Sequence, residues 1–165
     1  MSETWPVAHL DNIARLQVLA AGLAGAAFYE QVLPYDFDRV WGFFSDMERS
    51  LPAFDQAVAE FRVLSREGTR LIGKARGPRV PLHITFDVDL EPGWCWMTAR
   101  RQLYVVGFAA EPVGEQTRFA HLESYNVSGP AWLRVTAERL FSIRSGALQR
   151  HVRHDVEGIA SALGN

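Results

Sequence analysis

The spacing of hydrophobic residues divides the chain into a helical start, a strand-rich middle and a helical end. An alanine-rich apolar segment predicts a helix over about 11–25, with Asp11 as its N-cap. Residues 28–33 alternate well enough for a first strand, and Pro34 ends it. Asp36 then precedes apolar residues at helical spacing, which predicts a short helix followed by a second helical turn over the sequence MERSL.

The pattern changes to that of strands over residues 58–127. Apolar runs of about ten residues are separated by short segments rich in Gly and Pro, so we expect about six strands joined by hairpins. Connections this short require antiparallel pairing.

A helical period returns over about 130–163, where Pro130 suits the first turn of a helix. One apolar stripe runs along this segment through Leu133, Ala137, Leu140, Phe141, Leu148, Val152, Val156, Ile159 and Leu163. The helix would be about 50 Å long unless Ser145 and Gly146 bend it. We therefore predict an α+β fold, in which a curved antiparallel sheet of about seven strands surrounds the long C-terminal helix. A curved sheet cannot touch a straight helix everywhere, so space is left between them.

The register of the hairpins predicts which side chains face that space. With Pro92-Gly93 as turn residues, Val88 pairs with Met97 and Phe86 with Ala99, and the apolar set faces inward. Two-residue turns at Arg101-Gln102 and Val113-Gly114 carry the register on to the last strand. There they pair Phe108 with Phe119, Val106 with His121 and Tyr104 with Glu123. The last strand then places Phe119, His121, Glu123 and Tyr125 inside, and Trp94 and Trp96 on the outer face as a candidate contact surface.

Four sequence features together resemble the START-like, Bet v 1-like superfamily, whose bacterial members are often called polyketide cyclase/dehydrase-type proteins. They are FDRVW after the first strand, GWCWMTAR, TRFAHLESY near the last strand, and a terminal amphipathic helix. The resemblance covers residues 28–163 and implies a helix-grip fold with a deep apolar cavity, usually without a bound cofactor. Residues 1–26 have no counterpart in the basic pattern, so we expect an N-terminal helical extension over 1–26 and a START-like domain over 27–165. Tyr35 also departs from the pattern, because many relatives place proline or alanine there.

Two functions fit such a cavity. The first is a carrier or binding protein for a hydrophobic small molecule that is lipid, isoprenoid or polyketide-like. The alternative is a cofactor-free cyclase, aromatase or dehydratase, in which His121 and Glu123 transfer protons and a tyrosine stabilises the enolate. We expect the ligand to contact Phe86, Met97, Tyr104, Val106, Phe108, Phe119, His121, Glu123 and Tyr125. A third alternative, a domain that only binds other proteins, requires the cavity to be filled.

Other candidate sites are weaker. His151, His154 and Asp155 share one helix face, but that spacing near a C-terminus is typical of a solvated face, so we predict no metal site. Lys74, Arg76 and Arg79 gather at one hairpin end, where they form either a solvated rim or a docking site for an acidic carrier protein.

Composition limits the remaining classes. The net charge is −2, which does not suggest a nucleic-acid surface, and 48% of the 165 residues are hydrophobic. Residues 16–28 are apolar but too few to span a bilayer, so we expect no stable membrane insertion. Cys95 is the single cysteine and cannot form an internal disulfide, which favours a reducing cytoplasm. We expect a monomer or a homodimer.

Overall fold

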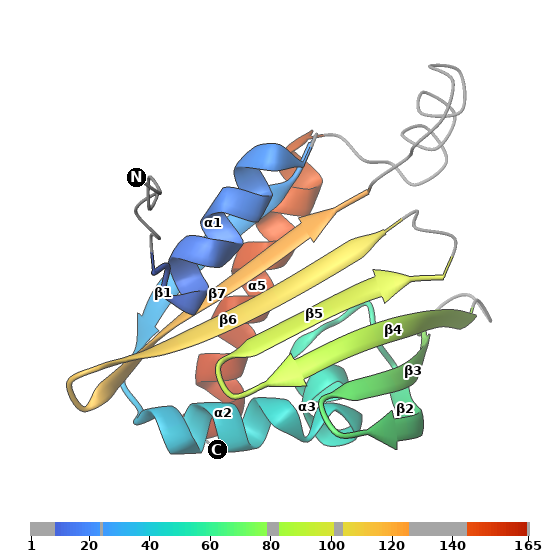
Figure 1. Cartoon of the computed structure of the whole chain (residues 1–165), viewed down its shortest axis with the longest axis horizontal. Coiled ribbons are helices and arrows are strands. Elements are labelled where there is room, and N and C mark those ends of the chain that lie inside the picture. The colour runs from blue at the N-terminus through green and yellow to red at the C-terminus, as the bar shows by residue number, and fades with distance from the viewer. Residues whose placement is uncertain (1–8, 24, 79–82, 101–103, 126–144, 165) are drawn as a thin grey trace, which may run out of the picture.

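The computed structural model describes residues 9–23, 25–78, 83–100, 104–125 and 145–164 (Figure 1). The helices are α1 (Asn12–Gly22), α2 (Phe37–Ser45), α3 (Met47–Phe54) and α5 (Ser145–Gly164). The strands are β1 (Ala27–Leu33), β2 (Glu60–Glu67), β3 (Arg70–Arg76), β4 (His83–Glu91), β5 (Trp94–Ala99), β6 (Val105–Val113) and β7 (Gln116–Ser124). They form one antiparallel sheet in the order β1-β7-β6-β5-β4-β3-β2, so the predicted α+β fold with a seven-stranded sheet is confirmed.

Both predicted helix caps are present. The Asp11 carboxylate accepts a hydrogen bond from the Ala14 backbone N–H at 2.6 Å, and Asp36 accepts one from the Arg39 N–H at 2.9 Å. Each bond satisfies a donor that the first turn of a helix otherwise leaves unpaired. The caps therefore fix where α1 and α2 begin.

The register of the β4–β5 hairpin is the predicted one, with Phe86 opposite Ala99 and Val88 opposite Met97. The predicted turn at Arg101-Gln102 falls among residues outside the described ranges. The pairing that follows it is nevertheless as expected, with Met97 opposite Val106.

The predicted β6–β7 turn is wrong. The turn residues are Gly114 and Glu115, because Val113 pairs with Gln116, and Gly114 adopts the positive φ of 60° that glycine tolerates best. Phe108 therefore lies opposite His121 and Val106 opposite Glu123, two residues away from the predicted pairs. A shift of two residues keeps every side chain on its face of the sheet, so the inward direction of the β7 residues is unaffected.

Burial confirms the two faces of the central strands. Phe86, Met97, Phe108 and Phe119 are each at most 4% exposed, whereas Asp87 is exposed and Thr85 and Thr98 are half-buried. The inner residues pack with α2, α3 and α5 in one apolar cluster. Figure 1 shows α5 crossing one face of the sheet and α2 and α3 closing one end.

The outer face is covered by α1, and this corrects the prediction for the two tryptophans. Trp94 is 3% exposed and Trp96 half-buried, because Ile13 and Leu16 of α1 pack in the same cluster as both rings. The helix approaches so closely that a Cβ on Gly107 would lie 2.6 Å from the Leu16 Cδ1 atom. The tryptophans are thus part of an internal contact with α1.

The described part of the C-terminal helix begins at Ser145, so its predicted start near Pro130 lies outside the described residues. Its apolar stripe is buried against the sheet through Val152, Val156 and Ile159. At its end, the Arg39 guanidinium of α2 donates to the Leu163 carbonyl at 2.7 Å. Among the described residues, no helix has the length and apolar character needed to cross a membrane.

Candidate functional site

The inner face of β7 carries the two ionisable side chains that the sequence singled out. His121 is fully buried and Glu123 is 1% exposed. The His121 ring stacks on Phe108 with 4.2 Å between ring centroids, which holds the imidazole in one plane. Its Nε2 atom lies 3.5 Å from Glu123 Oε1. The structure thus brings His121 and Glu123 together inside the fold.

Helix α5 adds two groups, and this overturns the predicted solvated face. Asp155 is fully buried, with Oδ2 at 3.4 Å from His121 Nδ1. One turn earlier, His151 places its Nε2 atom 3.5 Å from the same Asp155 oxygen and 3.5 Å from Glu123 Oε1. His154 is exposed, as predicted. The face that carries His151 and Asp155 is turned toward β7 because the apolar stripe of α5 presses this helix onto the sheet.

A fifth group comes from the residue that follows α3. The Asp55 carboxylate accepts a hydrogen bond from the Ala57 backbone N–H at 2.7 Å, and its Oδ1 atom lies 3.7 Å from His151 Nε2. We call Asp55, His121, Glu123, His151 and Asp155 the interior polar cluster. The Asp55 and His151 side chains are 11% and 25% exposed, so they form its outer rim, and the other three are buried.

The buried atoms of this cluster are poorly satisfied. Both nitrogens of His121, both carboxylate oxygens of Asp155 and Glu123 Oε2 have no hydrogen-bond partner among the described residues. The separations of 3.4 to 3.7 Å between the charged atoms exceed the usual length of about 2.7–3.2 Å for a hydrogen bond. Buried polar atoms without partners are costly and commonly mark a functional site.

The groups of the cluster shift each other's pKa values. Burial alone would raise the pKa of Glu123, but His121 and His151 outweigh it and lower that pKa to about 2. Burial would lower the pKa of His151, yet the neighbouring carboxylates, Glu123 foremost, raise it to about 9. Burial and the charge of Asp55 raise the pKa of Asp155 to about 8, and burial also raises that of Asp55. The neighbouring histidines thus favour the ionised form of Glu123, whereas burial favours the protonated forms of Asp155 and Asp55.

Aromatic rings fill the interior at the end closed by α2 and α3. The Phe44 ring lies 4.7 Å from Phe108 and 5.5 Å from Phe119, and Phe54 meets Phe108 edge-on at 6.0 Å. Phe108 and Phe119 thus pack against helix residues here. Their predicted role in contacting a ligand remains a prediction.

Two tyrosines lie at the opposite end of the inner face. The Tyr104 ring lies 4.8 Å from Tyr125 and 6.1 Å from Phe86, and both tyrosines are only half-buried. Burial and the nearby Glu123 carboxylate raise the pKa of Tyr104 well above its usual value, so its hydroxyl stays protonated and can donate a hydrogen bond. Val106 and Met97 lie on the same face, at 6% and 3% exposure.

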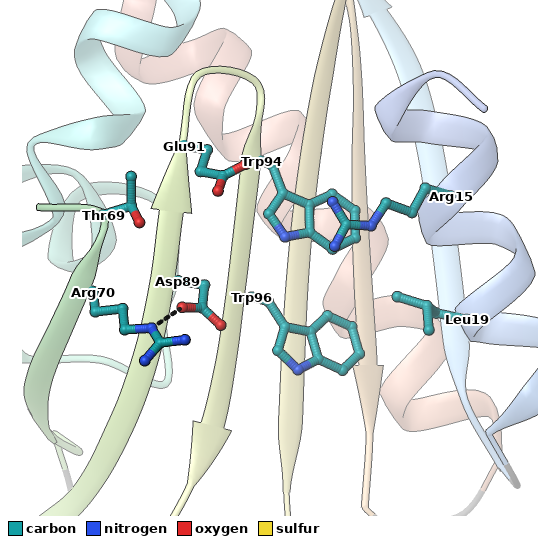
Figure 2. A pocket seen from close by; sticks show the side chains of 8 residues that line it. All are labelled: Arg15, Leu19, Thr69, Arg70, Asp89, Glu91, Trp94 and Trp96. Carbon is teal, nitrogen blue, oxygen red and sulfur yellow. Dashed lines mark ion pairs between the residues drawn. The ribbon is translucent and has the colours of Figure 1, made fainter. Parts of the chain in front are cut away.

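A groove of about 490 Å³ lies on the outer face, between α1 and the β4–β5 hairpin (Figure 2). Figure 2 shows the Arg15 guanidinium over the Trp94 ring, at 3.9 Å from its centroid, and the Arg70–Asp89 ion pair at 3.7 Å. Arg15, Arg70 and Asp89 already have partners within this groove. It is therefore a weaker candidate for a ligand site than the interior.

Sequence comparison finds no matching family model and no matching curated protein. Solved structures, by contrast, match most of the fold. TTHA0849 from Thermus thermophilus has a TM-score of 0.63 at 16% identity over 84% of this chain and 96% of its own. The ZhuI aromatase/cyclase from Streptomyces sp. R1128 has a TM-score of 0.60 at 12% identity over 84% and 93%. Ara h 8.0201 has a TM-score of 0.53 at 12% identity over 85% and 98%.

The chain has the START-like, Bet v 1-like helix-grip fold. The resemblance inferred from the sequence is thus confirmed at the level of the fold. In this chain the interior polar cluster lies between the sheet and α5.

Sequence reasoning missed three members of the interior polar cluster. Asp55 follows a short helix and carries no motif, and only the folded chain brings it near α5. His151 and Asp155 did carry a signal, because a histidine and a carboxylate four residues apart share one helix face. The prediction of a solvated face was wrong for His151 and Asp155. The apolar stripe of α5 packs on the sheet and turns these neighbouring polar residues toward β7.

Proposed function

We propose that the protein binds a hydrophobic small molecule, lipid, isoprenoid or polyketide-like, between the sheet and α5. The observation that supports this proposal is the difference in burial between the two ends of the inner face. Aromatic rings close the end near α2 and α3, whereas Tyr104 and Tyr125 at the other end stay half-buried. A ligand seated there would bury its apolar part against Phe86, Met97 and Val106.

The polar end of such a ligand would meet Glu123 and the two tyrosines. Glu123 Oε2 has no hydrogen-bond partner among the described residues, and the Tyr104 hydroxyl is a donor beside it. A ligand hydroxyl would donate to Glu123 Oε2, and a ligand carbonyl would accept from the Tyr104 hydroxyl, which offsets part of the cost of burying these groups. The helix-grip fold supports the proposal, because its interior is walled by both the sheet and the helix.

The test is binding of N-phenyl-1-naphthylamine, a neutral apolar fluorophore, to the full chain. We expect saturable binding that Met97→Trp weakens, since a larger side chain on the inner wall fills the space. Thr98→Trp is the matched control, because the adjacent side chain points to the other face. Equal binding by the parent and a folded Met97→Trp variant, or no binding at all, would contradict the proposal.

A second candidate function is a cofactor-free cyclase, aromatase or dehydratase that uses the same interior. The observation in its favour is that an imidazole, a carboxylate and a tyrosine hydroxyl (His121, Glu123 and Tyr104) converge on one face of the sheet. In that case His121 and Glu123 are catalytic residues, and Glu123→Gln would abolish turnover of a polyketide-like substrate while binding is kept. In the carrier function the same substitution weakens binding.

The setting of the proposed function is a reducing cytoplasm, which suits the free thiol of Cys95. Docking of an acidic carrier protein at the basic hairpin end also stays a proposal. Arg76 there already pairs with Glu60 at 3.1 Å, and Arg79 lies outside the described residues. Lys74 is half-buried.

A further inference from the structure

Three carboxylates and two imidazoles meet in the interior polar cluster, and their arrangement suits a cation. Asp55, His151 and Asp155 each offer one ligand atom, and these three atoms lie within 4.8 Å of one another. His151 and Asp155 are one helical turn apart, a spacing that lets two side chains of one helix bind the same ion. Asp55 approaches from the end of α3, so the two elements would hold the ion between them.

The separations fit a metal ion better than they fit hydrogen bonds. A tetrahedral ion with metal–ligand bonds of about 2.1 Å holds its ligand atoms about 3.4 Å apart. His151 Nε2 lies 3.5 Å from Asp155 Oδ2, 3.5 Å from Glu123 Oε1 and 3.7 Å from Asp55 Oδ1. The ligand atoms of Asp55, His151 and Asp155 all lie within 4.8 Å of one another, so one ion can be reached by all three side chains.

A second, independent observation is the unpaired state of the buried atoms. Asp155 is fully buried, yet neither of its oxygens has a hydrogen-bond partner among the described residues. Three carboxylates enclosed beside two histidines carry excess negative charge when ionised, and burying it without a counter-charge is costly. A divalent cation supplies that charge and uses the unpaired oxygens.

We infer that Asp55, His151 and Asp155 bind one divalent transition-metal ion, with Glu123 closing the inner side of the site. The imidazole nitrogen favours a transition ion such as Zn²⁺ over Mg²⁺ or Ca²⁺, which prefer oxygen ligands alone. The partly exposed rim of Asp55 and His151 gives the ion a path from solvent. This inference does not rest on the proposed ligand-binding function, because metal binding is measured with no organic molecule present.

The test uses the full chain prepared without a histidine tag, stripped with a chelator and dialysed against Zn²⁺. We expect about one Zn²⁺ per chain by inductively coupled plasma mass spectrometry, a raised Tm, and no displacement by equimolar Mg²⁺. His151→Ala and Asp155→Asn should each weaken Zn²⁺ binding by at least about tenfold. His154→Ala removes an exposed histidine of the same helix and should leave binding unchanged.

If Asp155→Asn fails to fold, Asp55→Asn serves instead, because Asp55 lies at the rim of the cluster. Sub-stoichiometric Zn²⁺ in the parent chain would overturn the inference. So would folded His151→Ala and Asp55→Asn variants that bind Zn²⁺ as the parent does, or an effect of His154→Ala as large as that of His151→Ala. No apolar molecule is present in the Zn²⁺ experiment. Its outcome therefore does not decide the proposed ligand-binding function, which the fluorophore experiment tests separately.

Discussion

At the scale of single residues, Glu123 has the most demanding environment in the described chain. Its carboxylate is buried, held ionised by two histidines, and has one oxygen without a hydrogen-bond partner among the described residues. A core position of this size would be filled by leucine or methionine if packing were its only role. The charge of Glu123 therefore supports the proposal that its carboxylate contacts a molecule bound in the interior.

Glu123→Gln tests this directly, because it keeps the shape of the side chain and removes the charge. With 2-naphthol and naphthalene as matched probes, we expect weaker binding of 2-naphthol by about 1–3 kcal/mol, the worth of one charge-assisted hydrogen bond. Naphthalene has no hydroxyl and should bind the two proteins equally. Isothermal titration calorimetry measures both affinities, and an equal loss for both probes would contradict a hydrogen bond from the ligand to Glu123.

Cys95 gives a second prediction at this scale. The thiol is fully buried on the inner face of β5, and burial raises its pKa far above the usual value. The native chain should therefore resist thiol-reactive reagents at pH 8, whereas the unfolded chain should react at once. Labelling with Ellman's reagent in the absence and presence of denaturant measures this, and rapid labelling of the folded chain would show that the inner wall opens at β5.

At the scale of elements, α1 packs closely on the outer face of the sheet. Ile13 and Leu16 are fully buried against β5, β6 and β7 in a cluster that includes Trp94 and Leu122. The other side of the helix faces solvent, since Val18 there is 58% exposed. Whether residues 1–26 form a separable extension stays a prediction, but this packing favours a helix that folds together with the sheet.

Leu16→Ala is expected to lower the free energy of unfolding by about 2–5 kcal/mol, because it leaves a cavity between α1 and the sheet. Val18→Ala is the matched control on the same helix and should change that free energy by less than about 0.5 kcal/mol. Urea denaturation followed by tryptophan fluorescence is suited to this test, since Trp94 and Trp96 lie in the contact. Equal stability of the two variants would mean that α1 is only loosely attached.

Periodicity predicted these elements well because each has to bury one face. Asp11 and Asp36 gave the helix starts, and alternation along β4 gave the face of every strand that follows. The β6–β7 register was misjudged because two neighbouring positions, Val113-Gly114 and Gly114-Glu115, suit a two-residue turn equally by composition. Which of the two turns forms depends on the hydrogen bonds along the whole β6–β7 hairpin, and the sequence of the turn alone does not reveal these.

At the scale of the whole molecule, the interior polar cluster is formed by segments that lie far apart in the sequence. Asp55 follows α3, His121 and Glu123 lie on β7, and His151 and Asp155 lie on α5. The sequence predicted His121 and Glu123 because alternation along a strand shows directly which side chains share a face of the sheet. The sequence carried a signal for His151 and Asp155 on one helix face but none for Asp55, and their proximity to β7 depends on how α3 and α5 pack on the sheet.

The helix-grip architecture gives these residues a common interior, filled with aromatic rings at one end and polar at its middle. Helix-grip structures similar to this one include an aromatase/cyclase at 12% identity, a level at which the fold is shared and the chemistry need not be. The proposed ligand-binding function therefore depends on whether the interior holds a small molecule.

Native mass spectrometry of the full chain, isolated gently from the cells that produce it, tests that claim most directly. We predict a complex whose mass exceeds that of the chain by one small organic molecule, and whose excess mass disappears after extraction with organic solvent. After extraction, the parent chain should bind an added hydrophobic candidate and again show a higher mass. The extracted Met97→Trp variant should show only its own mass. A chain that shows only its own mass before extraction, and takes up no hydrophobic candidate afterwards, would contradict the account.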